Sequence, residues 1–392
     1  MSTEQPSPSD LSLPSTRRRI PSWIQDILDR PASPPLHLWK PPEDPDKPSL
    51  PYMVSFTVEI RRRKAPTTAA LRPELPRHYL ETVTHSEAIM ASPLESNTNS
   101  ENDTNKDTET DAQSGQVRNE TAQLLATAPI ATGDARSAQL LAVTVTPNGS
   151  DTASSKPYEA NFESGIGHHP EDCVYSASDD YINEATAYEY LHEAGKTGSF
   201  VPEYYGCWNL CLPITIKGAS KLRSVNLVLI ERLRGDSLLS TRIRSNPDGR
   251  ETMDSFHYPE EFRLELLARA MDGYARLLRL GIVQRDFAAR NLILVAQSPA
   301  TPGHMVHDHH LPRIVLVDYN NAYILENTTQ DQIQSLPVNP AAVFWAEHIW
   351  RQFRGWVPHE WEDTRLQKEW LLERFAGPGQ RGLYLPTQDL EL

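Results

Sequence analysis

Apolar side chains recur at every third or fourth position over residues 259–280, which is the spacing of one buried face on an α-helix. Glu260 and Glu261 suit the positive end of a helix dipole, and Gly281 suits the C-terminal cap. We therefore predict one long amphipathic helix over this range. Its buried stripe comprises Phe262, Leu266, Leu267, Ala270, Met271, Tyr274, Leu277 and Leu278.

Helical spacing also covers residues 181–194, and Gly195 is a natural stop for that helix. Shorter runs of alternating or continuous apolar residues predict β-strands instead. These runs lie at residues 52–59, 140–147, 202–208, 225–231, 292–295 and 313–317. Strands and helices together predict an α+β fold class.

Two long segments have too few apolar residues to build a core. Residues 1–48 are rich in Ser, Pro and charge, and residues 95–120 are almost devoid of apolar side chains. Such segments cannot bury enough surface to offset the entropy of ordering. We expect a disordered leader over residues 1–48 and a disordered insertion over about residues 92–136.

Charge and composition narrow the set of partners and compartments. The formal net charge of the 392-residue chain is −14, which argues against a nucleic-acid partner despite basic runs at residues 17–19 and 61–64. Three cysteines do not form a disulfide framework, so we expect a reducing compartment. Neither a secretory signal nor a membrane-spanning apolar run is visible. These features favour a cytoplasmic or nuclear location without a membrane partner.

Polar residues of the types that bind metal ions and phosphate groups follow the predicted 259–280 helix. Asp286 and Asn291 lie between this helix and the 292–295 strand, and Asp318 follows the 313–317 strand. Adjacent strand ends can bring the three side chains together. Carboxylate and amide oxygens bind Mg²⁺, and a carboxylate can accept the proton of an attacking hydroxyl. We expect Asp286 to act as the base and Asn291 and Asp318 to bind the metal.

Each of these residues also has a structural interpretation. Asp286 and Asn291 can cap a loop, and Asp318 can be a turn residue. Their combination and order favour the site. Another alternative, a metal or nucleic-acid module, would use the histidine-rich loop at residues 297–311 together with the basic runs. The loop histidines are His304, His307, His309 and His310.

The segment from Gln284 to Asn291 resembles the His-Arg-Asp-x-x-x-x-Asn catalytic loop of protein kinases, and residues 318–320 resemble their Asp-Phe-Gly. Residues 183–191 resemble the helix that carries an ion-pairing glutamate, which would be Glu184. From about Leu50 to its C-terminus, the chain is similar to kinase-like proteins of filamentous fungi, which are related to protein kinases and aminoglycoside phosphotransferases.

This resemblance implies a bilobal fold, with a β-rich N-lobe over residues 49–231 and a mainly helical C-lobe over residues 232–392. It implies ATP and Mg²⁺ as cofactors and an unknown protein or small molecule as phosphate acceptor. Catalytic roles would fall to Asp286 and Arg285, although Arg285 can equally pair with a carboxylate. Cofactor-binding roles would fall to Glu184, Glu231, Asn291 and Asp318, with Glu231 in the segment that contacts adenine.

The chain departs from the kinase pattern at several positions. It has no Gly-x-Gly-x-x-Gly loop, and the 140–147 strand has no phosphate-binding lysine near Val143. Lys64 and Lys156 are possible substitutes, which we expect in neighbouring loops. Gln284 replaces histidine, and Asn320 replaces glycine while tolerating positive φ. The alternative function is therefore a pseudokinase, a nucleotide-sensing or scaffolding module without turnover.

Overall fold

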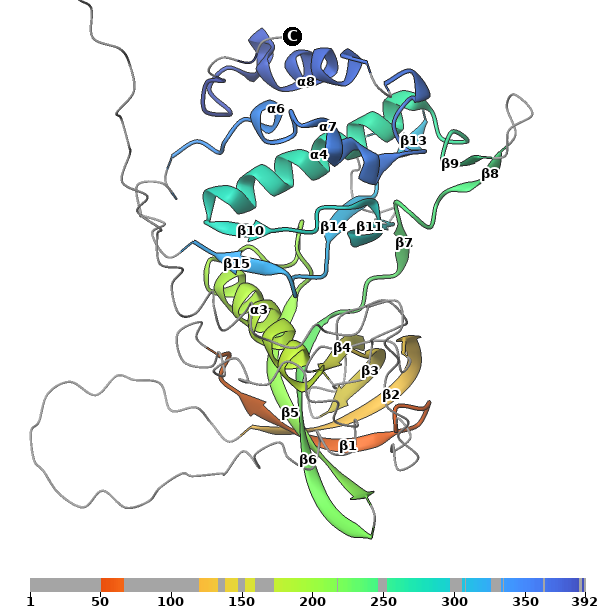
Figure 1. The fold of residues 1–392 in the computed structure, drawn as a ribbon, viewed down its shortest axis with the longest axis vertical. Coiled ribbons are helices and arrows are strands. Elements are labelled where there is room, and N and C mark those ends of the chain that lie inside the picture. The colour runs from red at the N-terminus through yellow and green to blue at the C-terminus, as the bar shows by residue number, and fades with distance from the viewer. Residues whose placement is uncertain are drawn as a thin grey trace, which may run out of the picture.

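The structure of the protein is a computed structural model. It describes residues 51–66, 120–132, 138–146, 152–158, 173–216, 218–245, 252–296, 305–306, 308–325, 333, 335–361, 364–387 and 390, with only the backbone of residues 152–158, 173–176, 216, 347 and 348. The fold mixes α-helices and β-strands, with a strand barrel at one end and most helices at the other (Figure 1). The predicted leader and most of the predicted insertion lie outside the described residues.

Within the described residues, six antiparallel strands close a barrel in the order β1-β2-β3-β4-β6-β5. Alternate side chains fill its interior, which is why Ile60, Leu124, Val143 and Leu227 are each at most 1% exposed. The strands are β1 (Thr57–Arg63), β2 (Thr121–Ala131), β3 (Leu140–Thr146), β4 (Thr152–Tyr158), β5 (Tyr204–Ile216) and β6 (Ala219–Glu231).

The prediction of a disordered insertion is wrong over strand β2. Residues 121–131 fall inside the 92–136 range expected to be disordered, yet they pair with both β1 and β3. The inward positions Ala122, Leu124 and Ala126 are buried and alternate with exposed neighbours. Two of these three residues are alanines, so the alternating pattern is weak in the sequence and the pairing partners decide the structure.

The helices are α3 (Cys173–Glu193), α4 (Glu260–Arg279), α6 (Pro340–Val343), α7 (Glu347–Trp350) and α8 (Leu366–Ala376). Helix α4 matches the predicted 259–280 helix, with Pro259 as its N-cap and Gly281 at φ +79° just after its C-cap. Helix α3 begins eight residues before the predicted 181–194 helix. The Tyr190 hydroxyl on α3 donates to the main-chain oxygen of Leu280 at 2.9 Å, so α3 is tied to the end of α4.

Short sheets connect the barrel with α4. Strands β14, β11 and β7 form one sheet, while β10 pairs with β15. Hairpins are formed by β8 with β9 and by β12 with β13. The strands are β7 (Gly235–Ser237), β8 (Ile243–Ser245), β9 (Thr252–Asp254), β10 (Ile282–Gln284), β11 (Leu292–Val295), β12 (Met305–Val306), β13 (His309–His310), β14 (Arg313–Leu316) and β15 (Ala322–Ile324).

A second apolar core packs α3, α4 and the C-terminal helices together. Trp356 is 1% exposed, and its indole Nε1 donates to the main-chain oxygen of Arg263 on α4 at 3.0 Å. The Arg263 guanidinium returns a hydrogen bond to the main-chain oxygen of Trp356. This reciprocal pair fixes the C-terminal segment against α4. Among the helices in the described part of the chain, none is long and apolar enough to cross a bilayer.

Candidate functional site

Gln284, the last residue of β10, is fully buried and joins two loops. Its Nε2 donates to the main-chain oxygen of Asp318 at 3.0 Å, and its Oε1 accepts from the main-chain N–H of Asp286 at 3.0 Å. The Tyr274 hydroxyl of α4 donates to the main-chain oxygen of Gln284 at 2.9 Å. Because a carboxamide both donates and accepts, this one side chain satisfies both loops.

Asn291 orients the carboxylate of Asp286. Its Nδ2 donates to the main-chain oxygen of Asp286 at 3.0 Å and to Asp286 Oδ2 at 2.8 Å. Arg290 forms an ion pair with the other carboxylate oxygen, Oδ1. Since the Asn291 amide nitrogen is committed to Asp286, its Oδ1 faces away and has no hydrogen-bond donor within the described residues.

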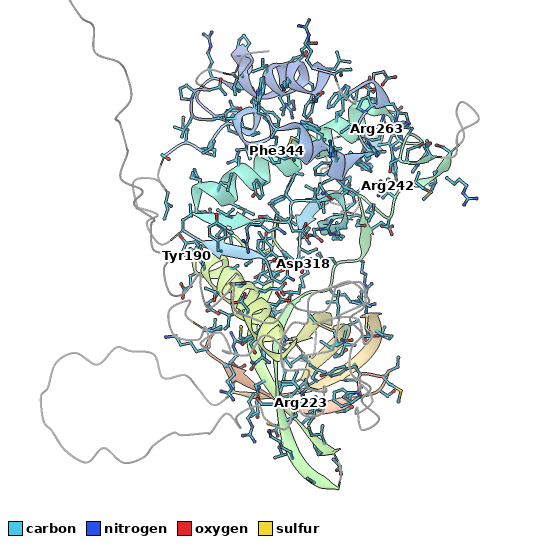
Figure 2. All side chains as sticks on the ribbon, in the orientation of Figure 1. Tyr190, Arg223, Arg242, Arg263, Asp318 and Phe344 are labelled. Carbon is cyan, nitrogen blue, oxygen red and sulfur yellow. The ribbon has the colours of Figure 1, made fainter. Side chains whose placement is uncertain are left out.

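Pairing between β11 and β14 positions Asp318. Leu292 faces Leu316, and the main-chain N–H of Val317 donates to the oxygen of Asn291 at 2.9 Å, so the next residue, Asp318, lies beside Asn291. Asp318 has φ +69°, a left-handed conformation that costs a non-glycine residue about 1–2 kcal/mol. Such strain persists where surrounding contacts enforce it, often at functional sites. Asp318 lies between the barrel and α4 (Figure 2).

Helix α3 contacts the segment that follows Asp318. Asn183 Nδ2 donates to the main-chain oxygen of Asn320 at 3.0 Å, and the ring of Tyr188 lies 5.1 Å from the ring of Tyr319. Burial and the neighbouring Glu184 carboxylate raise the pKa of Tyr319 well above its usual value. Glu184 is itself 1% exposed, so it is a buried residue that faces this segment rather than a solvated one.

The expectation that Lys156 lies in a loop is wrong, because this residue is within β4, the last strand before α3. It is paired with Val228 of β6, and directly opposed residues share one face of a sheet. Val228 belongs to the core that includes Tyr188 of α3. Position 156 therefore lies on the face of the sheet turned toward α3. The strand sequence Thr-Ala-Ser-Ser-Lys-Pro-Tyr has no apolar run and contains Pro157, so the sequence alone does not predict a strand there.

Two of the predicted site residues hold other parts of the structure. The Glu231 carboxylate pairs with Arg313 and accepts the main-chain N–H of Glu203 at 3.1 Å. The Glu231 side chain therefore links the end of β6 to Arg313 and Glu203, and these contacts occupy its carboxylate. Arg285 is exposed, donates to the main-chain oxygen of Asn321 at 3.0 Å and lies over the Tyr323 ring. It braces the chain after Asp318 instead of joining Asp286.

The histidine loop does not bring together a metal site in the part of the chain that is described. His309 and His310 form β13, which pairs with β12, while His304 and His307 lie outside the described residues. No group of three or more His, Cys, Asp or Glu side chains that could hold a metal occurs among the described residues. The oxygen donors of the predicted site are two aspartates and one asparagine, so Mg²⁺ there would need further oxygens from a ligand.

No protein-family model and no curated protein matches this chain. Among solved structures, it is similar to the crystal structure of a Stt7 homolog from Micromonas algae soaked with ATP, with 14% identity and a TM-score of 0.31. The match covers 50% of this chain and 49% of that one, so this chain spans about half of that structure. At this TM-score, the likeness does not carry residue roles from that protein to this one.

Proposed function

We propose that this protein is a two-lobed, kinase-like phosphotransferase that uses ATP and Mg²⁺. Residues 49–231 would form the N-lobe and residues 232–392 the C-lobe. The observation that carries the proposal is the buried Gln284 carboxamide, which bonds the main chains of Asp286 and Asp318 at 3.0 Å each. With Asn291 bonded to Asp286, the residues Asp286, Asn291 and Asp318 belong to one hydrogen-bonded unit, which Asp318 joins through its main chain.

In the proposed reaction, an acceptor hydroxyl attacks the γ-phosphorus of ATP. A new oxygen–phosphorus bond forms, the bond to the β,γ-bridging oxygen breaks, and ADP leaves with that oxygen's electron pair. Asp286 would accept the hydroxyl proton. Its carboxylate is held by Asn291 and Arg290, which fixes its direction before the acceptor arrives.

The donor set fits Mg²⁺ in chemical type. The Oδ1 of Asn291 and the carboxylate of Asp318 are hard oxygen ligands, and Mg²⁺ commonly takes one or two carboxylates plus substrate phosphates. When bound, the metal would supply charge neutralisation to the phosphates. The strained φ of Asp318 fits this role, because it costs stability that an ordinary turn residue would not need.

Lys156 supplies the missing phosphate ligand in this proposal. It would bind the nucleotide phosphates and pair with Glu184, which is buried on α3. The register of β4 against β6 supports this pairing, because it puts position 156 on the α3 side of the sheet. An ammonium beside the phosphates stabilises charge as the transfer proceeds.

Turnover of ATP by the full-length protein in the presence of Mg²⁺ tests the proposal. Asp286→Asn keeps the shape of the side chain and removes the base, so we expect turnover to fall about 10²- to 10⁴-fold. Asp272→Asn is a matched control, because Asp272 also pairs with an arginine four residues on, at 2.9 Å, but on α4. Equal turnover in Asp286→Asn and the parent protein would reject the role of Asp286.

A second candidate function is a nucleotide-binding module without turnover. The connection between β2 and β3, residues 132–139, has a single glycine, Gly133, whereas a glycine-rich phosphate loop has several. A thermal-shift titration separates the two functions. A shift with ATP and Mg²⁺ in the absence of turnover favours the binding module, and turnover with the Asp286 dependence above favours the enzyme.

A further inference from the structure

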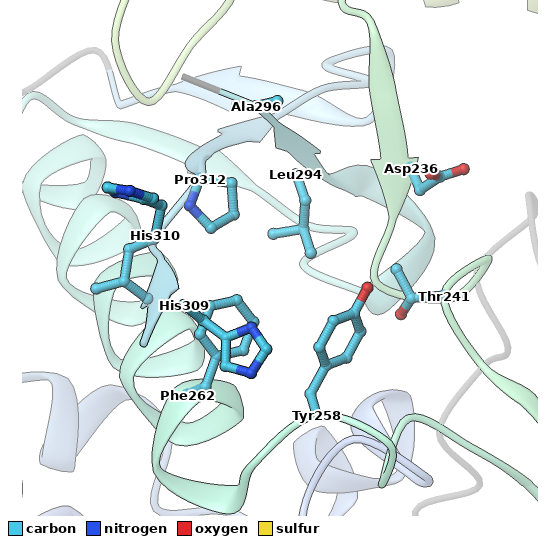
Figure 3. A pocket seen from close by; sticks show the side chains of 10 residues that line it. Asp236, Thr241, Tyr258, Phe262, Leu294, Ala296, His309, His310 and Pro312 are labelled. Atoms are coloured by element: carbon cyan, nitrogen blue, oxygen red, sulfur yellow. The ribbon is translucent and has the colours of Figure 1, made fainter. Parts of the chain in front are cut away.

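A pocket of about 320 Å³ lies beside the sheet formed by β7 and β11, at the start of α4. Figure 3 shows it from close by, with rings on one side and β7 on the other. None of the residues that line it belongs to the proposed phosphotransferase site. They are Asp236, Thr241, Tyr258, Phe262, Leu294, Ala296, His309, His310, Leu311 and Pro312.

Three aromatic rings form one wall of this pocket. The Tyr258 and Phe262 rings are stacked with centroids 5.4 Å apart, and the His309 ring lies 5.3 Å from Phe262 (Figure 3). Phe262 is 4% exposed, so it is fixed in the core, while His309 is exposed at the opening. Leu294 and Leu311 add an apolar floor. Such a wall favours a flat ligand with an apolar body.

The charge at the pocket favours a cation. Asp236 on β7 is exposed at the edge, above Thr241 in Figure 3 with its carboxylate directed outward from the rings, and no Lys or Arg occurs among the described lining residues. The Thr241 hydroxyl is already committed to Leu238 and Ser255, at 2.9 and 3.0 Å. Tyr258 contributes the electron-rich face of its ring, which attracts a cation. The polar selectivity of the pocket therefore rests mainly on Asp236 and the rings.

We propose that this pocket binds a small, flat organic cation, an aromatic amidinium or ammonium. Its ring would lie against Tyr258 and His309, and its charge would lie at the edge of the pocket, on the side of Asp236. The inference is independent of the proposed phosphotransferase. Asp236 is paired with Leu294 on β11, so the acidic edge and the apolar floor are held at fixed spacing by the sheet.

Benzamidine and benzamide test this proposal, because they have the same shape and only benzamidine is charged. Titration of the full-length protein by ligand-observed NMR should give a dissociation constant for benzamidine of about 1 mM, as expected for so small a ligand. Benzamide should bind about two- to fivefold more weakly, the size of an exposed charge contact. Equal affinity for the two compounds, or no binding of benzamidine, would overturn the proposal.

Variants then locate the binding. Asp236→Asn should lower benzamidine affinity to that of benzamide and leave benzamide unchanged, and His309→Leu should weaken both compounds. Both residues are exposed, so the fold should survive, and unchanged thermal unfolding checks this. Glu193→Gln is the control variant, because it also removes one exposed carboxylate, at the end of α3 and outside the pocket. If Asp236→Asn binds benzamidine as tightly as Glu193→Gln does, the pocket is not the cation site.

Discussion

Gln284 donates a hydrogen bond from its side-chain Nε2 to the main-chain oxygen of Asp318, at 3.0 Å, across 34 residues of the chain. The same carboxamide accepts the main-chain N–H of Asp286. Because Gln284 is fully buried, water cannot replace its side chain as the hydrogen-bond partner of either main-chain group. The spacing between the two aspartates therefore depends on one side chain that would not itself touch a substrate.

Gln284→Leu should disrupt this spacing while filling the same volume. It leaves a buried carbonyl and a buried N–H without a partner, which costs about 1–3 kcal/mol for each group. Thermal or urea unfolding measures that loss, and Mg²⁺-dependent ATP binding should weaken with it. Gln284→His keeps one donor and one acceptor and should recover part of both. Parent-like stability in Gln284→Leu would show that the bond is unimportant.

Tyr274 provides a prediction at high pH. Burial, followed by the neighbouring Tyr323, raises the pKa of Tyr274 from its usual 10 to about 12. The unfolded chain thus loses this proton near pH 10 and the folded chain only near pH 12. The stabilisation is complete below pH 10 and is lost as the pH rises through 12. Two pKa units correspond to about 3 kcal/mol.

Tyr274→Phe removes this titration together with the hydrogen bond to Gln284. It should be less stable than the parent protein at neutral pH by about 1–3 kcal/mol. Between pH 10 and pH 12, the difference in unfolding free energy between the two proteins should shrink. Denaturant unfolding across this range measures it. A difference that is constant with pH would mean that Tyr274 ionises alike in the folded and unfolded chains.

Lys156 and Glu184 can be tested as a pair by a double-mutant cycle. Lys156→Met should reduce turnover by orders of magnitude, because a charge at the phosphates is lost. If the two residues act together, Glu184→Gln adds little to Lys156→Met, and the effects on ATP affinity are not additive. Lys64→Met is the matched control, since Lys64 is exposed after β1. Strictly additive losses would exclude the pairing.

Glu231 is predicted to act on stability through its pair with Arg313, whose side chains are 25% and 23% exposed. Glu231→Gln should lower the unfolding free energy by about 1–3 kcal/mol, the range for hydrogen bonds to charged groups. The control is Glu369→Gln, whose pair with Arg365 is 41% and 71% exposed and should contribute at most about 1 kcal/mol. Chemical denaturation compares them. Equal losses in the two variants would contradict a structural role for Glu231.

Helix α4 and two short apolar strands were predictable from the sequence, and weakly patterned strands were not. Helix α4 agrees with its prediction to within a residue at each end, because its apolar stripe is long and Gly281 ends it. Strands β11 and β14 match for the same reason, since both are short apolar runs. Strand β2 was missed because its inward positions are mostly alanines, and β4 because it contains serines and a proline.

Side-chain partners in the site were less predictable than its composition. The order Asp286, Asn291, Asp318 is readable in the chain, but the bridging role of Gln284 requires β10 and the end of β14 to lie side by side. Likewise, Glu231 and Arg313 are 82 residues apart, so no local pattern reveals their ion pair. Long-range pairing of polar groups follows from the tertiary fold, which hydrophobic periodicity does not specify.

We propose that Asn291 and Asp318 share one divalent ion with a bound nucleotide. Electron paramagnetic resonance titration of Mn²⁺, with a non-hydrolysable ATP analogue, measures this directly in the full-length protein. We predict one Mn²⁺ site that requires the nucleotide, weakened at least about tenfold by Asp318→Asn or Asn291→Leu, as expected for loss of a ligand. Asp272→Asn should leave it unchanged. Equal Mn²⁺ affinity in the parent protein and Asp318→Asn would contradict the claim.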